Sequence, residues 1–264
     1  LLLYEESYRK PIPFVHGDVR DHATLQRYLD WADAVVWLAA LVGDPACALN
    51  ENLTMDINKH SVAYLKEHFQ GRIIFMSSCS VYGASDGILS ETSPLNPLSL
   101  YARTKLWCEE IFSSHPRAII FRLGTLFGVS DSFSRIRFDL VVNTLTMRAA
   151  LHKKISVFGG NQYRPLLHVR DAAAAIALAL DKPQTGIYNL HSENVTIVQI
   201  ADRIKHFFPD VHVAITDTQF QDNRNYRVSS EKAHADLGFQ AKLVTDDGIS
   251  ELKTLLQEKR IKDS

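Results

Sequence analysis

The amino-acid sequence predicts an α/β fold, in which a doubly wound parallel sheet carries helices on both faces and a smaller α/β region follows it. Two observations support this prediction. In the first part of the chain, short apolar runs alternate with segments of helical periodicity. The runs are continuously apolar, as in parallel strands that are covered on both faces. After about Gly124 the alternation becomes less regular, so we divide the 264 residues into a first region at 1–150 and a second at 151–264, some of whose segments return to the first.

Each element of the first region rests on one of these two patterns. Apolar runs predict strands at 14–17, 34–40, 72–77 and 118–123. Apolar residues that recur every three or four positions predict helices at 23–29, 53–69, 100–112 and 138–151.

The second region continues with shorter elements. Strands are predicted at 155–158, 187–190 and 211–216, and helices at 169–180, 197–208, 229–237 and 246–259. Thr196 and Gln199 have the spacing of a capping box, which gives the helix at 197–208 a clear start. We interpret the polar segments 84–99 and 128–137 as functional loops beside the carboxyl edge of the sheet.

Composition and charge argue against several classes of protein. The 29 basic and 30 acidic residues leave a net charge of −1, which offers no footprint for nucleic acid or an anionic membrane. No apolar run approaches the ~20 residues of a membrane-spanning helix. The leading leucines are followed at once by Tyr4-Glu5-Glu6, unlike a signal peptide. Three scattered cysteines without a CxxC pair predict reduced thiols and a cytoplasmic protein.

The segment Tyr101-Ala-Arg-Thr-Lys105 is the strongest sign of chemistry. Four residues on a helix place the tyrosine and the lysine on one face, one turn apart. A neighbouring ammonium favours phenolate and should lower the pKa of Tyr101. A tyrosine tuned in this way can take a proton from a sugar hydroxyl or return it. Taken alone, the same pattern also describes a surface tyrosine–lysine pair.

A serine-rich turn supplies the next candidate group. The sequence SSCSVYG begins at Ser77 and follows directly on the predicted strand at 72–77. Catalytic groups in such sheets lie at the carboxyl ends of strands. The Ser78 hydroxyl can donate to a carbonyl oxygen or accept from an alcohol, although a plain polar turn would have the same sequence. Ser78, Tyr101 and Lys105 are therefore a candidate catalytic set.

Six segments together resemble the extended short-chain dehydrogenases/reductases, the NAD-dependent nucleotide-sugar epimerases, dehydratases and reductases with a Rossmann-like fold. They occur in the family's order and spacing: GDVRD at 17–21, VWLAA at 36–40, SSCSVYG at 77–83, YARTK at 101–105, FRLGTLFG at 121–128 and RPLLHVRD at 164–171. The resemblance implies an NAD(P)-binding region at 1–150 and a mostly substrate-binding region at 151–264. It also implies NAD as the cofactor, with NADP as the alternative, and a nucleotide-diphosphate sugar as the substrate.

The resemblance assigns one group of residues to the cofactor. The matching positions are Asp18, Val19, Leu38, Ala39, Ala40, Asn58, Ser77, Tyr101 and Lys105. Asp18 with Val19 would hold the adenine ring, and Lys105 would bind the nicotinamide ribose. Without the family, Asp18 could equally be a turn residue after a strand.

The resemblance assigns a second group to catalysis and substrate binding. Ser78, Tyr101 and Lys105 match the catalytic triad, and the substrate-binding positions are Ser78, Cys79, Asn143, Arg164 and Arg224. Both arginines match residues that grip the nucleotide diphosphate, for which the guanidinium fork is suited. Arg227 competes with Arg224 for this role. Asn143 either touches substrate or satisfies the helix surface, and His168 is expected to be a packed strand residue.

Residues 79 and 80 differ from the family's motifs, and these differences reduce the number of activities that the resemblance implies. Its dehydratases place Asp-Glu directly after the catalytic hydroxyl residue, whereas this chain has Cys79 and Ser80, so 4,6-dehydration is disfavoured. Its double epimerases place a catalytic cysteine where Ser80 stands, so Cys79 is expected to be a packed thiol rather than an acid. The expected function is an epimerase that forms a transient keto-sugar, with Tyr101 as base and hydride transfer to nicotinamide. A 4-keto-sugar nucleotide reductase and a non-catalytic nucleotide-binding or regulatory relative are the alternatives.

Three further expectations concern the chain's start, its assembly and metals. The family opens with a β-α-β unit containing a GxxGxxG turn, and the sequence has no such turn, so we expect this N-terminal start to be missing. Tyr64 and Trp107 lie beyond the main apolar stripes of the helices at 53–69 and 100–112, which predicts a homodimer through these helices. The 11 histidines show no metal-ligand spacing, so we expect no metal site.

Overall fold

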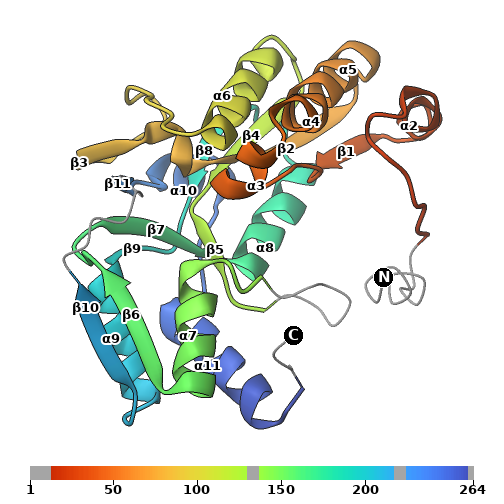
Figure 1. The fold of residues 1–264 in the computed structure, drawn as a ribbon. Helices are drawn as coiled ribbons and strands as arrows, with labels where there is room; N and C mark the ends of the chain where they lie inside the picture. Colours follow the sequence, from red (N-terminus) through yellow and green to blue (C-terminus); the bar gives the residue numbers. More distant parts are fainter. Residues whose placement is uncertain (1–12, 130–136, 217–223, 261–264) are drawn as a thin grey trace.

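The computed structural model describes residues 13–129, 137–216 and 224–260. Its main sheet has parallel strands in the order β1-β2-β4-β8 (Figure 1). These strands are β1 (Ala34–Trp37), β2 (Arg72–Ser78), β4 (Ala118–Leu123) and β8 (Gly186–Leu190). In the register of the sheet, Ile74 pairs with Val36 on one side and with Ile119 on the other. The predicted α/β fold with a parallel sheet is confirmed.

Helices cover both faces of this sheet. The first face packs against α2 (His22–Leu29), α5 (Ser61–His68) and α6 (Leu100–Phe112). The second face packs against α8 (Val169–Leu180) and α10 (Glu231–Leu237). Along β2, Ile73 and Phe75 enter the first core, whereas Ile74 and Met76 enter the second. Because successive side chains of a strand point to opposite faces, this double burial explains the continuously apolar sequence of β2.

The helix predicted at 53–69 is a continuous run with an irregular middle. It consists of α4 (Glu51–Met55), the π-helical turn η1 (Asp56–His60) and α5. A shorter helix, α3 (Asp44–Leu49), precedes it and was not predicted. π turns are rare and often occur at functional sites. Here the π turn carries the buried Asn58.

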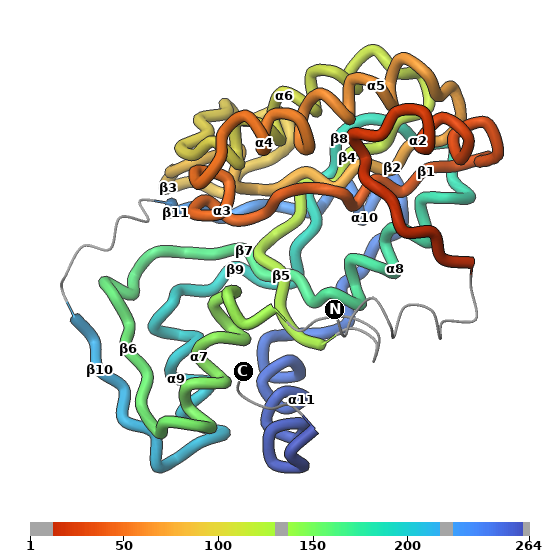
Figure 2. The backbone as a smooth tube through the Cα atoms, turned by 45° about the vertical axis from the view of Figure 1, so that its right-hand side comes forward, coloured from red at the N-terminus to blue at the C-terminus, as the bar shows by residue number. Residues whose placement is uncertain are grey.

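The second part of the chain forms smaller sheets beside three helices (Figure 2). One sheet is β5 (Thr125–Phe127), β7 (Tyr163–His168) and β9 (Glu193–Thr196), and another pairs β6 (Lys154–Phe158) with β10 (His212–Thr216). The helices are α7 (Val141–His152), α9 (Ile197–Phe207) and α11 (Thr245–Gln257). The predicted capping box is present: the amide of Gln199 donates to the Thr196 hydroxyl at 3.2 Å, and the amide of Thr196 donates to Gln199 Oε1 at 2.8 Å.

Two of the loop and strand predictions need correction. The expected loop at 84–99 begins with the strand β3 (Ala84–Leu89), which pairs in parallel with β11 (Asn225–Val228). Residues 14–17, expected as a strand, join no sheet of the described residues, and Phe14 and Val15 are largely exposed. A strand needs a hydrogen-bonded neighbour, and the sheet order of the described part ends at β1. The other expected loop, 128–137, lies mostly outside the described residues, at 130–136.

Among the helices that the structure describes, none combines the length and the apolar character that crossing a membrane requires.

Candidate active site

A cavity of about 690 Å³ lies at the carboxyl end of the main sheet. Ser78 enters its wall from the last position of β2, Tyr101 from the first turn of α6, and Gly124 from the end of β4. The opposite wall comes from α7 and β6 in the second part of the chain. The volume is in the range of small-molecule sites, and the position is where ligands bind in parallel sheets.

Ser78 and Tyr101, two of the three predicted catalytic residues, meet at this cavity. The Ser99 side chain caps α6 by accepting from the amide of Ala102 at 3.2 Å, which places Tyr101 in the first turn. Burial raises the pKa of the Tyr101 phenol to about 12, although a hydrogen bond with Ser78 and the charge of Arg137 act in the lowering direction. The Ser78 oxygen also accepts from the amide of Ser80 at 3.1 Å, so its hydroxyl is held beside the phenol.

Lys105 lies one turn further along α6, but its ammonium is buried beneath the cavity. Its Nζ donates to the carbonyl of Met76 at 2.7 Å and lies 5.8 Å from the centre of the Tyr101 ring. Burial lowers the pKa of Lys105 to about 8. The expectation that Lys105 lowers the pKa of Tyr101 is therefore wrong for this structure, because burial outweighs the nearby charges and the cation acting on the phenol is Arg137.

The predicted cofactor residues Leu38, Ala39 and Ala40 follow β1 at the same edge of the sheet, outside the cavity wall. Asn58 fixes the loop that they begin. Its side chain exchanges two hydrogen bonds with the main chain of Leu41, at 2.7 and 2.9 Å, and donates to the Thr104 hydroxyl at 3.3 Å. Asn58 thereby joins this loop to α6 next to Lys105.

Asp18 and Val19, the other predicted cofactor residues, lie in a turn outside the cavity wall. Asp18 pairs with Arg20 at 2.6 Å, and the hydrogen bond from this side chain lowers the pKa of Asp18 to about 2.

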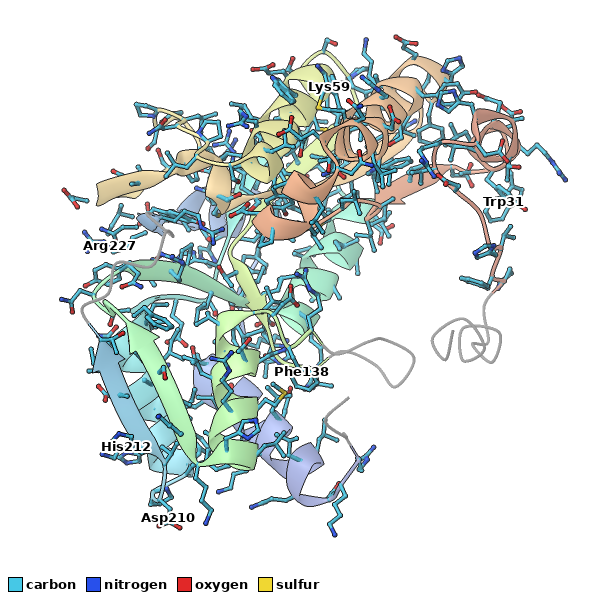
Figure 3. All side chains as sticks on the ribbon, viewed as in Figure 1. Trp31, Lys59, Phe138, Asp210, His212 and Arg227 are labelled. Carbon is cyan, nitrogen blue, oxygen red and sulfur yellow. The ribbon has the colours of Figure 1, made fainter. Side chains whose placement is uncertain are left out.

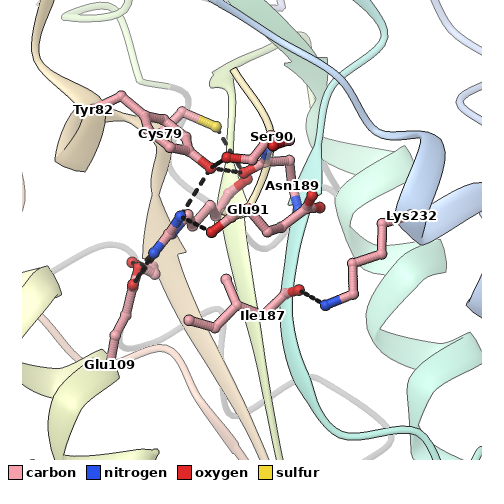
Figure 4. Close-up of polar contacts among 10 residues, drawn as sticks. Cys79, Tyr82, Ser90, Glu91, Glu109, Ile187, Asn189 and Lys232 are labelled. Atoms are coloured by element: carbon pink, nitrogen blue, oxygen red, sulfur yellow. Dashed lines mark hydrogen bonds and ion pairs between the residues drawn. The ribbon is translucent and has the colours of Figure 1, made fainter. Parts of the chain in front are cut away.

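Ser77 and Cys79 flank Ser78, the predicted catalytic serine, but have buried partners. Figure 4 shows Cys79 and Glu109 among these contacts. The Ser77 hydroxyl donates to Glu109 at 2.5 Å, and Glu109 pairs with Arg122 at 2.6 Å. The Cys79 thiol donates to the carbonyl of Arg122 at 3.2 Å, and burial raises its pKa. Cys79 is thus packed, as expected, and does not line the cavity, whereas Ser77 reaches its wall while bound to Glu109.

Arginines dominate the charge of the cavity. Among the described residues four arginines line it, namely Arg137, Arg148, Arg164 and Arg224, against the carboxylates of Asp44 and Asp139. Arg164 is buried and donates to the carbonyl of Tyr163 at 2.8 Å and to that of Arg224. Arg224 lies 3.5 Å from Asp44. The surplus of positive charge suits a substrate with phosphate groups.

The structure separates the arginines that the sequence left in competition. Arg227 does not line the cavity: it belongs to β11, and its guanidinium lies 4.8 Å from the centre of the Tyr163 ring (Figure 3). Arg137 and Arg148 were not predicted as site residues. Neither residue belongs to a sequence motif. They are recognised only in the structure, where Arg137 follows the segment 130–136, Arg148 lies on α7, and both line the cavity.

Asn143 holds the two flanks of the segment 130–136 together instead of lining the cavity. Its side chain accepts from the amide of Gly128 at 3.0 Å and donates to the carbonyls of Gly128 and Arg137 at 3.2 and 3.0 Å. Nearby, His168 is buried, as expected, with Nδ1 accepting from the amide of Arg170 and Nε2 at 3.1 Å from Glu251. Burial lowers the pKa of His168 to about 4, so the ring is neutral at pH 7 and Nε2 carries the proton.

Comparison with known proteins identifies the family. A model described as the NAD dependent epimerase/dehydratase family matches residues 3–190. The chain belongs to the NAD-dependent epimerase/dehydratase family. The match includes Ser78, Tyr101, Lys105 and Arg164, and it confirms the resemblance found in the sequence.

Curated members of the epimerase/dehydratase family are distant in sequence. The chain is 28% identical over 176 residues to a Bacillus subtilis (strain 168) protein named uncharacterized UDP-glucose epimerase YtcB, covering 61% of this chain and 53% of that protein. It is 26% identical over 209 residues to N-acetyl-alpha-D-glucosaminyl-diphospho-ditrans,octacis-undecaprenol 4-epimerase of Escherichia coli O157:H7, covering 75% of this chain and 62% of that protein. The chain thus spans between about half and two thirds of the length of these relatives.

Solved structures of the family share the fold. MoeE5 in complex with UDP-glucuronic acid and NAD superimposes with a TM-score of 0.80 at 23% identity, over 98% of this chain and 95% of that one. UDP-glucose 4-epimerase of Thermotoga maritima with UDP-glucose gives 0.81 at 20% identity, over 94% and 85%. The predicted doubly wound, Rossmann-like architecture therefore agrees with the folds of these proteins.

Proposed function

We propose that the protein is an NAD-dependent nucleotide-sugar epimerase that acts through a transient keto-sugar. One observation carries the proposal: Ser78 and Tyr101 meet in a cavity that four arginines also line. Hydroxyl groups beside an anion-binding wall suit a sugar that is attached to a diphosphate. The names of the relatives, two of which are epimerases of diphosphate-linked sugars, support the same class.

In this proposal Tyr101 moves the proton of the reacting hydroxyl. Ser78 shares the hydrogen bond to the oxygen that becomes a carbonyl. A phenol with its pKa raised to about 12 is protonated at pH 7, so Tyr101 is held ready to return a proton and needs added positive charge to act as a base. Arg137 already supplies part of this charge. NAD, held beside Ser78, Tyr101 and Lys105, would supply reversible hydride transfer at the sugar carbon that bears this hydroxyl.

The residues of the described part fit the reactive half of NAD. The Ser78 hydroxyl, the Tyr101 phenol and the Lys105 ammonium gather at the carboxyl end of β2, a donor set that suits a ribose and a carbonyl. Lys105 would hold the ribose, and the loop at 38–40, fixed by Asn58, would border the cofactor. We assign no residue to the cofactor diphosphate. Among the described residues, three or more potential metal ligands do not gather anywhere.

Arg164 and Arg224 are proposed to hold the substrate diphosphate, with residues 1–150 as the cofactor region and 151–264 mostly as the substrate region. Asn143 would act indirectly, through the segment flanks. The three buried free thiols are consistent with the proposed cytoplasmic location.

We also propose a homodimer through α5 and α6. Within one chain Tyr64 already stacks between His22 and His68, with ring centroids 3.9 Å apart, and Lys59 Nζ lies 4.6 Å from the centre of the Trp107 ring. The dimer interface would add contacts between chains to these contacts within one chain. Sedimentation of the wild type and of Trp107→Glu tests this, because the variant should dissociate. A wild type that sediments as a monomer at high concentration excludes the dimer.

The activity is tested with UDP-glucose, UDP-N-acetylglucosamine and UDP-glucuronic acid, each incubated with the protein and NAD. We expect one of them to be converted to an epimer without net change in NADH. Tyr101→Phe should lower the rate by ~10²–10⁴-fold and Ser78→Ala should also lower it, whereas Tyr64→Phe, distant from the cavity, should not. Net consumption of NADH with a 4-keto sugar would indicate the reductase instead. No turnover of the panel together with bound nucleotide would favour a binding protein.

A further inference from the structure

A basic pocket lies at the opposite end of the main sheet from the active site. Its volume is about 380 Å³, and Arg72, Arg117, Lys182 and Thr185 contribute to its wall. Arg72 begins β2, the same strand that ends at Ser78. At ~3.3 Å per residue the strand separates the two sites by roughly 20 Å.

Arg72 is the unusual member of this pocket. Its side chain is 94% buried, since only 6% of its surface is exposed. Its two terminal nitrogens donate to the carbonyls of Arg117 and Ala179, at 3.4 and 3.0 Å, while its Nε has no hydrogen-bond partner. In the part of the chain that the structure describes, no carboxylate lies within ion-pair distance of it. A buried guanidinium normally has a carboxylate or phosphate partner, so this arrangement is costly without one.

The neighbouring charges add to this cost. Burial lowers the pKa of Arg72, and the positive charge of Arg117 acts in the same direction. Lys182 adds a third cation to the wall. The opposing groups are the Asp181 carboxylate and the carbonyl end of α8, which the terminal nitrogen of Arg72 already engages. Three cations against one carboxylate leave a surplus of two positive charges.

We propose that this pocket binds a phosphate group, either as inorganic phosphate or as part of a small phosphorylated molecule. A phosphate dianion matches the surplus charge, and its oxygens can accept from Arg117, from Lys182 and from the Thr185 hydroxyl, while the buried guanidinium of Arg72, whose Nε is covered by protein, contributes its charge. The site is separate from the catalytic cavity and does not depend on the proposed epimerase function. A purely structural role for Arg72, as a cap of α8, would account for its two carbonyl contacts but leaves its buried positive charge without a compensating anion.

The test is calorimetric titration of the protein with inorganic phosphate at constant ionic strength, with chloride as the reference anion. Arg117→Gln/Lys182→Gln should weaken phosphate binding at least about tenfold, because it removes two cations at surface positions without touching the core. Asp181→Asn should tighten binding several-fold, since it removes the opposing carboxylate of the wall.

The matched control is Arg224→Gln, which removes a cation from the catalytic cavity and should leave binding at the proposed site unchanged. A second titration with glycerol 3-phosphate shows which source of phosphate the pocket prefers.

Binding no stronger than that of chloride would overturn the proposal. So would phosphate binding that is lost in Arg224→Gln and kept in Arg117→Gln/Lys182→Gln, because the anion would then occupy the catalytic cavity. Failure of the epimerase assay would leave these outcomes unaffected.

Discussion

Glu109 and Arg122 form an ion pair of 2.6 Å inside the protein, behind the strand end that carries Ser78. Both side chains are 2% exposed, and Arg122 also donates to the Tyr82 hydroxyl at 2.8 Å. Burial alone would lower the pKa of Arg122, but the hydrogen bonds and charge of Glu109 more than compensate and raise it. Because Ser77 donates to the same carboxylate, the pair fixes the residue next to Ser78 against α6.

Breaking this pair should be strongly destabilising. Arg122→Met leaves the Glu109 carboxylate buried without its cation, so we expect a loss of about 3–5 kcal/mol in the free energy of unfolding. Glu109→Gln/Arg122→Met should recover part of this loss, because no net charge remains buried. Urea denaturation measures both variants, with Arg20→Met as the control for an exposed pair. A loss in Arg122→Met no larger than in Arg20→Met would contradict the prediction.

Lys105 should make stability depend on pH in the alkaline range. Its pKa falls from 10.5 to about 8 on folding, so between these values the unfolded chain binds more protons and stability rises with pH. Relative to Lys105→Met, the wild type should gain up to about 1.4 kcal/mol per pH unit in this window. The burial cost of the ammonium is fully present below pH 8. Denaturation curves of both proteins from pH 7 to 10.5 test the slope, and a constant difference would refute the assignment.

Gly128 and Gly186 offer a matched pair of substitutions. Both have positive φ, +85° and +96°, so alanine is strained at either position. A Cβ at Gly186 meets no atom within 4 Å, whereas one at Gly128 would lie 2.0 Å from His168 Nε2. We expect Gly186→Ala to cost about 1–2 kcal/mol and Gly128→Ala about 1–3 kcal/mol more, because the buried His168 cannot retreat. Equal losses in thermal denaturation would show that His168 moves aside.

Asn143 should slow the hydrogen exchange of the Gly128 amide, which donates to its side chain. In Asn143→Ala the amide of Gly128 loses its acceptor, so its hydrogen exchange should accelerate by up to about tenfold. Asn194→Ala is the control, because Asn194 also joins two segments, through its bond to the carbonyl of Val228, but away from this one. Mass spectrometry of peptides around 128 and 137 measures the effect. Unchanged exchange at Gly128 would show that the flanks hold each other without Asn143.

The sequence predicted best where burial alone determines the pattern. The bounds of β4 and α6 agree with the prediction, because both elements meet the core along their whole length. The bounds of β7 were not predicted, although His168 was expected to lie in a strand, because Pro165, which pairs opposite Asn194, is atypical inside a strand. β3 was missed because its partner β11 is more than 130 residues away and its own sequence, ASDGIL, lacks a strand pattern.

The same holds for the candidate site: residues whose positions depend on nearby sequence could be predicted, and residues whose positions depend on distant segments could not. Motif spacing placed Ser78 and Tyr101 together, since both are fixed by the ends of adjacent elements. It could not place the ammonium of Lys105, which is set by a carbonyl 29 residues earlier in the chain. Motif spacing also could not identify Arg137. Its effect on the pKa of Tyr101 depends on where the fold places a segment that is distant in sequence.

The π turn at Asp56–His60 sets the rotational register of the helical run that contains it. In this turn the amide of Ser61 reaches the carbonyl of Asp56, five residues back, so the run holds one residue more than a regular α-helix of the same rise. The wider turn absorbs the extra residue, so α4 and α5 keep the relative rotation of a continuous helix. Deleting a single residue here would restore regular geometry and leave Thr54, whose hydroxyl donates to the carbonyl of Cys47 at 2.8 Å, facing α3. A one-residue change in a regular part of the run would instead rotate one side by about 100° relative to the other. The π turn is therefore the place in this run where the length can change by one residue, with loss only of the bulge that carries Asn58.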